Sequence, residues 1–81
     1  MTAAKIKDRI AECATLFGFE YAGHDGNVDP YYIPESGKHE YLLFYNGTEK
    51  TVSDIDSVMN TPFINGKSLG ELADKITITE W

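Results

Sequence analysis

The sequence contains a single cysteine, Cys13, so no disulfide can form within the chain and no zinc site can be built from several cysteines. It also lacks any apolar run close to the roughly 18 residues that a membrane-spanning helix needs. The first residues, MTAAKIKDRIAEC, are amphipathic and have no apolar signal-peptide core. From these absences we expect a cytoplasmic protein without disulfides or a membrane anchor.

Basic residues are scarce as well. The chain has 13 acidic residues against 7 lysines and arginines, and its formal net charge is −6. Binding to nucleic acids depends on lysines and arginines that displace counterions from phosphates, and an anionic membrane surface attracts the same residues. We therefore expect neither direct nucleic-acid binding nor membrane binding, and we expect any partner to be cationic.

The composition is otherwise that of a globular protein. Hydrophobic residues make up 42% of the 81 residues and charged residues 25%, which is close to typical usage. This length suits one domain over residues 1–81. A core of this size leaves little room for an enclosed pocket of about 300–1,000 Å³, so a ligand site is expected on the surface.

The spacing of apolar residues predicts three helices. Apolar side chains recur every three or four residues over residues 3–17, which is typical of an amphipathic helix, and Gly18 is the expected stop. Shorter helices are predicted at residues 54–60 and 68–75, the second opened by a Ser-x-x-Glu capping box.

The remaining apolar segments predict strands. Residues 24–30 are rich in Gly, Asn, Asp and Pro and are predicted to form a loop. Asn46-Gly47 predicts a tight hairpin turn. The predicted strands are residues 19–23, 31–33, 40–45, 48–53 and 76–81. The sequence therefore predicts an α+β fold: a small antiparallel sheet of about four to five strands, with the N-terminal helix and two short C-terminal helices packed on one face.

One acidic segment resembles the start of a calcium-binding loop. Asp25, Asn27 and Asp29 have the D-x-N-x-D spacing whose alternate oxygens can converge on one ion. The pattern then breaks, because Pro30 occupies the position that needs glycine and Ser36 the position that needs a bidentate glutamate. The sequence favours a turn-rich loop over a metal site at these residues.

Groups suited to catalysis are few and isolated. His24 and His39 are the only histidines. His24 beside Asp25 is compatible with an acid–base pair, but general acid–base catalysis needs a positioned group with a tuned pKa, and such a pair in a polar loop is usually only solvated. Cys13 lies on the apolar side of the first predicted helix, where packing in the core is expected. We therefore expect no enzyme and no cofactor, although an active site completed by a partner stays open.

A surface for protein recognition is the remaining hypothesis. Most tyrosine rings are expected in the core, yet a sheet covered on one face leaves some of them outside. The residues predicted for an interaction surface are Tyr31, Tyr32, Tyr45, Asp25, Asp29 and Glu35. The leading interpretation is an accessory or protein-interaction domain whose partner could also be a second copy or a strand added at an edge, at residues 19–23 or 76–81. The alternatives are an acidic mimic of nucleic acid that regulates a DNA-binding protein, and a small enzyme or enzyme subunit.

Overall fold

The computed structural model describes residues 2–13 and 16–80. Three helices and five strands follow one another along the chain in the predicted order. They are α1 (Ala3–Cys13), β1 (Phe17–Tyr21), β2 (His24–Ile33), β3 (Lys38–Tyr45), β4 (Thr48–Val52), α2 (Ile55–Asn60), α3 (Leu69–Leu72) and β5 (Thr77–Glu80).

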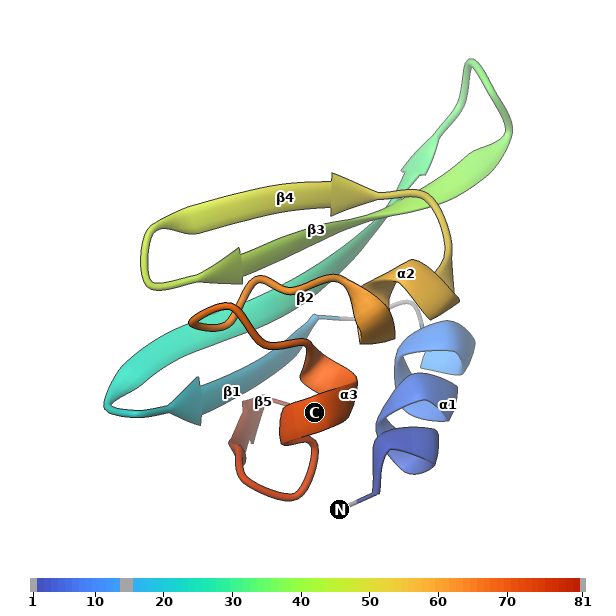
Figure 1. Cartoon of the computed structure of the whole chain (residues 1–81). Helices are drawn as coiled ribbons and strands as arrows, with labels where there is room; N and C mark the ends of the chain where they lie inside the picture. The colour runs from blue at the N-terminus through green and yellow to red at the C-terminus, as the bar shows by residue number, and fades with distance from the viewer. Residues whose placement is uncertain (1, 14–15, 81) are drawn as a thin grey trace.

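The strands form one antiparallel sheet in the order β4-β3-β2-β1-β5. β1 to β4 are a meander joined by hairpins, and β5 returns to pair with β1. The helices lie together on one side of this sheet (Figure 1). The predicted α+β fold is therefore confirmed.

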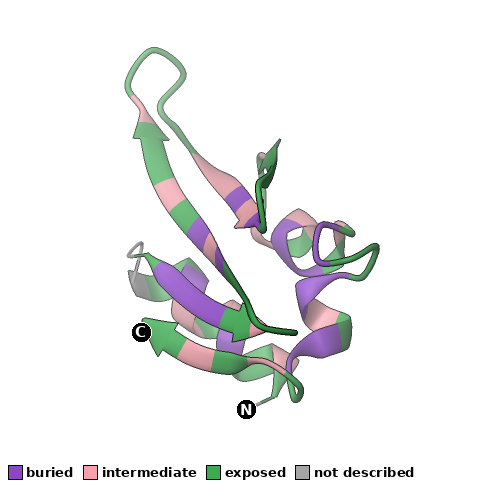
Figure 2. Cartoon of the chain, turned by 90° about the vertical axis from the view of Figure 1, so that its left-hand side faces the viewer, coloured by how far each residue is buried: buried purple, intermediate pink, exposed green. Residues whose placement is uncertain are grey.

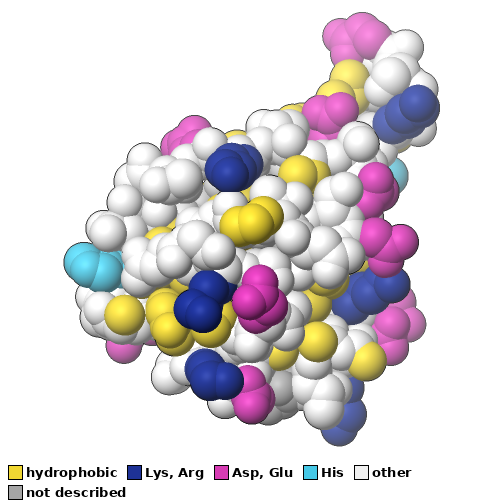
Figure 3. All heavy atoms as spheres, in the orientation of Figure 1, with side chains coloured by type: hydrophobic (Ala, Val, Ile, Leu, Met, Phe, Trp, Pro, Cys, Tyr) yellow, Lys and Arg dark blue, Asp and Glu magenta, His cyan; other side chains and the backbone are white. Residues whose placement is uncertain are grey.

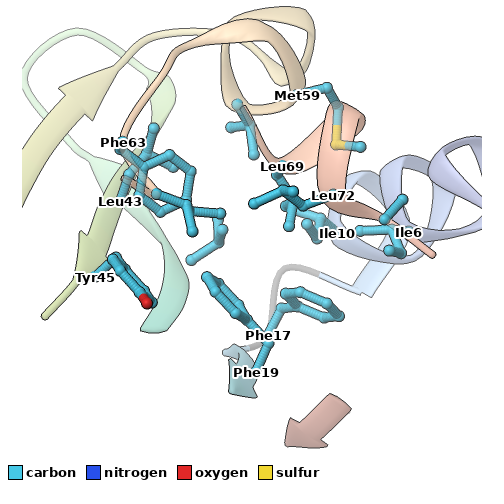
Figure 4. Packing of buried hydrophobic residues seen from close by; sticks show 14 residues of the cluster. Ile6, Ile10, Phe17, Phe19, Leu43, Tyr45, Met59, Phe63, Leu69 and Leu72 are labelled. Atoms are coloured by element: carbon cyan, nitrogen blue, oxygen red, sulfur yellow. The ribbon is translucent and has the colours of Figure 1, made fainter. Parts of the chain in front are cut away.

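The core lies between the helices and the face of the sheet that they cover (Figure 4). Buried residues alternate with more exposed ones along parts of β2 and β3 (Figure 2). Phe19 is at the centre, with its ring centroid 6.1 Å from that of Phe17 and 6.2 Å from that of Tyr45. Helices contribute aliphatic side chains, among them Ile6, Ile10, Val58, Leu69 and Leu72.

The first helix is shorter than predicted. Phe17 does not extend α1 but begins β1, so Gly18 is not a helix stop. Gly18 instead permits the close approach of β5, because a Cβ atom at this position would lie 2.8 Å from Cβ of Glu80. Cys13 ends α1, but its side chain and residues 14–15 lie outside the described part of the chain.

The predicted loop at residues 24–30 is wrong, because this segment is the first part of the ten-residue strand β2. A two-residue turn at Ala22-Gly23, with φ angles of 51° and 80°, starts the strand earlier than expected. Gly26 fits because the Phe19 ring lies over it, with Cε2 2.7 Å from the place of a Cβ atom. Pro30 lies beyond Val28, where β1 has ended and one edge of β2 is free, and such an edge tolerates a residue without an N–H.

The turn and the helix cap that short sequence motifs predict are both present in the structure. Asn46 and Gly47 form the β3–β4 turn with φ angles of 46° and 83°. The predicted capping box is present at Ser68, whose Oγ accepts a hydrogen bond from the Glu71 backbone N–H at 3.2 Å. The third helix is shorter than expected, since α3 ends at Leu72.

Candidate functional site

The face of the sheet opposite the helices, here called the outer face, carries a pair of apolar side chains. Successive side chains of a strand point to opposite faces, and Leu43 and Tyr45 of β3 are buried in the core. Leu42 and Phe44 alternate with them and therefore project from the outer face, where both are half-buried. None of the helices in residues 2–13 and 16–80 covers this face (Figure 1). Apolar surface is thus left open beside the central strands.

Acidic side chains surround this apolar pair. The same alternation and the strand register place five acidic residues of β1–β4 on the outer face: Glu20, Asp25, Asp29, Glu40 and Glu49. Asp29 is the direct cross-strand partner of Leu42, and Glu49 is that of Phe44. The apolar pair therefore has a carboxylate on each side.

Two of these acidic residues face each other across neighbouring strands and lower the stability of the sheet. Glu20 of β1 and Asp25 of β2 are direct cross-strand partners, and like charges in this position destabilise a sheet. On the outer face of β1–β4, as far as the structure describes it, Lys38 at the far end of β3 is the single basic residue. The face is therefore strongly acidic, at some cost to stability.

The other lysines and arginines lie away from this face. They are Lys5, Lys7 and Arg9 on α1, Lys50, whose Nζ donates to the Pro62 carbonyl oxygen at 2.9 Å, Lys67 and Lys75. Figure 3 shows basic side chains spread over the helix-bearing side of the molecule. One of them is partly neutralised there, because Lys7 Nζ lies 2.6 Å from Asp56 Oδ1, and this contact raises the pKa of Lys7. The acidic and basic groups are thus unevenly divided between the two faces.

The β2–β3 hairpin extends the sheet beyond its neighbours. β1 pairs with β2 only as far as Val28, and β4 pairs with β3 only as far as Tyr41. Residues 31–40, here called the arm, therefore form a two-stranded projection (Figure 1 and Figure 2). Two exposed tyrosines are on it, Tyr31 at 38% and Tyr32 at 55% exposure.

These two tyrosines point to opposite sides of the arm. Tyr31 is on the side of the outer face, and its hydroxyl donates to Glu40 Oε1 at 3.1 Å. Partial desolvation, followed by this hydrogen bond, raises the pKa of Tyr31 above its ordinary value. Tyr32 is on the other side, with its ring 5.2 Å from that of His39. Only Tyr31 can act together with Leu42 and Phe44.

The structure separates the residues that the sequence predicts for an interaction surface. It brings together Asp25, Asp29 and Tyr31 on the outer face. Glu35 is exposed in the turn at the tip of the arm. The prediction for Tyr45 is wrong: its side chain is only 2% exposed, and its hydroxyl donates to the Tyr21 carbonyl oxygen at 2.6 Å.

Sequence reasoning missed several residues of this surface. Leu42 and Phe44 lie in a continuous run of aromatic and leucine residues, YLLFY, whose two faces look alike before the sheet is assembled. Glu20 and Glu49 belong to other strands, and only the strand register brings them to the same face.

The calcium-loop interpretation is also corrected. Asp25, Asn27 and Asp29 lie in the strand β2 and not in a loop. Side chains two residues apart on a strand point the same way at a spacing of about 6.6–6.8 Å, so their oxygens do not converge on an ion. Within the residues described, no three His, Cys, Asp or Glu side chains are grouped so that they could hold a metal.

The histidines are not brought together either. His24 begins β2, with its ring 6.1 Å from that of Tyr45, and His39 is near the opposite end of the same hairpin. A surface groove of about 420 Å³ lies between the helices, and its lining includes Met59 and the Lys7–Asp56 ion pair. It contains neither histidine.

Of the two strands expected at an edge of the sheet, the one at residues 76–81 is at an edge, as β5. The strand expected at residues 19–23 is β1, which lies between β2 and β5 and is not an edge. The edges are β4 and the four-residue strand β5. In the described ranges, no helix has the length and apolar character needed to cross a bilayer.

Known proteins offer no guide to what this surface binds. Comparison of the chain with protein-family models, with curated proteins and with solved structures found no match.

Proposed function

We propose that this chain is a non-enzymatic protein-interaction domain that binds a cationic partner through its outer face. The observation that carries the proposal is the apolar pair Leu42 and Phe44, which are half-buried on the face that no described helix covers and placed between Asp29 and Glu49. An apolar centre with a polar rim is the usual arrangement of a protein interface. The single cysteine supports a cytoplasmic location.

The charge of the outer face affects how fast a partner associates and in which orientation it docks. A face of one charge sign raises the rate at which an oppositely charged partner arrives, and it suppresses partners of the same sign. On the helix-bearing side, basic side chains are interspersed with acidic ones, so a cationic partner is attracted more strongly to the outer face than to the other side. The division of charge therefore favours a single docking orientation.

A nucleic-acid mimic is the second candidate function. The direct pairing of Glu20 with Asp25 favours this function. The two like charges destabilise the sheet, but their close spacing resembles that of charges along a phosphate backbone. The two candidates differ in what they need. A mimic depends on charge alone, whereas an interaction domain also depends on Leu42 and Phe44.

Affinity capture from the source cells, followed by mass spectrometry, tests the proposal. The double variant Asp25→Asn/Asp29→Asn removes two charges from the outer face, and Glu12→Gln/Asp74→Asn removes two from elsewhere. We expect the first variant to lose the bound protein and the second to retain it. Equal retention by both variants contradicts binding through the outer face.

A third variant, Leu42→Ser/Phe44→Ser, separates the two candidates. For the interaction domain we expect it to lose the partner. For a mimic we expect retention of the partner, together with release when the salt concentration rises from about 0.1 M to about 1 M, which shortens the Debye length from about 10 Å to about 3 Å. Circular dichroism of each variant checks that the fold is intact.

A further inference from the structure

The apolar surface of the outer face continues from the sheet onto the arm. Phe44 and Leu42 are two residues apart on β3, and Tyr31 is the diagonal neighbour of Leu42, since it pairs with Glu40. Ile33 follows two residues beyond Tyr31 on β2 and is half-buried. These residues, Phe44, Leu42, Tyr31 and Ile33, are here called the apolar stripe. With about 7 Å for each step, the stripe is about 20 Å long.

From the proposed function, on which this inference rests, we infer that the partner presents a cationic amphipathic α-helix to the apolar stripe. A helix rises 1.5 Å per residue, so about 13 residues cover 20 Å. A helix of that length has an apolar side that is continuous over three to four turns. The stripe and one side of such a helix therefore match in length and chemistry.

The hydrogen-bonding needs of the partner's backbone favour a helix over an extended segment on this face. The face of a sheet offers side chains but no free backbone N–H or C=O groups, and buried backbone groups without hydrogen bonds are costly. A helix satisfies its own backbone groups internally. The opposite face of this sheet is already covered in that way, by α1, α2 and α3.

The free edges of the sheet favour strand addition less. Pro30 lies on the free edge of β2 beside the arm and has no N–H to donate. The edge strands β4 and β5 are only five and four residues long, and short edge strands give few backbone hydrogen bonds. Recognition through side chains on the outer face is thus the stronger mode.

The acidic residues on either side of the apolar stripe determine which charges the partner helix should carry beside its apolar face. Asp29 lies on one side of the stripe, and Glu49 lies on the other. Lysine or arginine on both sides of the helix's apolar face would meet a carboxylate on each side. A helix with acidic flanks would meet like charges and be rejected.

A designed peptide tests the inference with the full chain. The peptide has about 14 residues, with leucines along one helical face and lysines on both flanks. A scrambled peptide of identical composition distributes its leucines around the helix, and a third peptide has glutamate in place of each lysine. Backbone amide shifts of the ¹⁵N-labelled protein report where each peptide binds, and circular dichroism reports its helicity.

We expect the amphipathic basic peptide to gain helicity and to shift the amides of β2, β3 and β4 around Leu42 and Phe44. We expect Leu42→Ser/Phe44→Ser to weaken its binding about tenfold or more, and the control Tyr32→Ser, on the other side of the arm, to leave it unchanged. Equal affinity for the scrambled peptide overturns the inference but leaves a cationic partner that contacts Leu42 and Phe44 without an amphipathic helix, as the proposed function allows. Shifts confined to the helix-bearing face overturn both.

Discussion

A substitution at Gly26 tests whether β2, one of the strands of the outer face, is placed correctly. It lies in β2 directly opposite Phe19 of β1. A Cβ atom at residue 26 would lie 2.7 Å from Phe19 Cε2 and 2.9 Å from the Phe44 carbonyl oxygen. Phe19 is fully buried between other rings and cannot move aside freely. The substitution Gly26→Ala should therefore strain the core and the β2–β3 pairing together.

The expected cost follows from these contacts. Adding a methyl group to a packed core costs about 1–3 kcal/mol, and a clash with both a buried ring and a backbone oxygen puts Gly26→Ala at about 2–3 kcal/mol on this scale. In a domain of this size, each kcal/mol lowers the melting temperature by about 4–8 °C. If residue 26 lay in an open loop instead, alanine would be neutral or would stabilise by about 0.4–1 kcal/mol.

Urea denaturation followed by circular dichroism measures the effect. Gly37→Ala is the control, since no atom lies within 4 Å of its added Cβ and only its φ of 68° resists alanine. In a double-mutant cycle with Phe19→Leu, we expect the double variant to be about 1 kcal/mol more stable than the sum of the single changes predicts. A Gly26→Ala protein as stable as the wild type, or an additive cycle, would refute the assignment of β2.

Three further changes probe the groups that hold the sheet and helices together. Tyr45→Phe removes the donor to the Tyr21 carbonyl oxygen and should cost about 0.5–1.5 kcal/mol in denaturant unfolding, the usual contribution of one hydrogen bond. Ser68→Ala removes the N-cap of α3 and should cost about 1 kcal/mol in the same assay. The Ser57 backbone N–H lowers the pKa of Asp54 below 3.8, so its stabilisation is complete above this pH and is lost as pH falls through the folded-state pKa. Asp54→Asn should therefore reduce the acid sensitivity of unfolding.

Each of these predictions has an outcome that contradicts it. Wild-type stability of Tyr45→Phe would mean that the tyrosine hydroxyl is not needed in the core. No loss on Ser68→Ala would exclude a contribution of the capping box. A parallel fall in the stability of Asp54→Asn and the wild type below pH 3.8 would show that Asp54 is not a stabilising cap.

Short-range signals in the sequence determined which elements form and in what order. The three-to-four spacing around Ile6 and Ile10 predicted α1, Asn46-Gly47 predicted the β3–β4 turn, and Ser68 predicted the start of α3. Each of these features depends on neighbours within about one helical turn or one tight turn. Such interactions can be identified before the chain is assembled, which is why the α+β fold was predictable.

Long-range pairing decided the rest. Turn-forming residues such as Gly26 and Pro30 entered a strand because Phe19 and a free edge accommodate them, and neither condition is visible locally. The sequence indicated Asp25, Asp29 and Tyr31 as surface residues. Only the register of the sheet joined them to an apolar pair from β3 and to acidic residues of β1 and β4 on one face. The side chains of a strand alternate between two faces, and which face the helices cover is settled by tertiary packing.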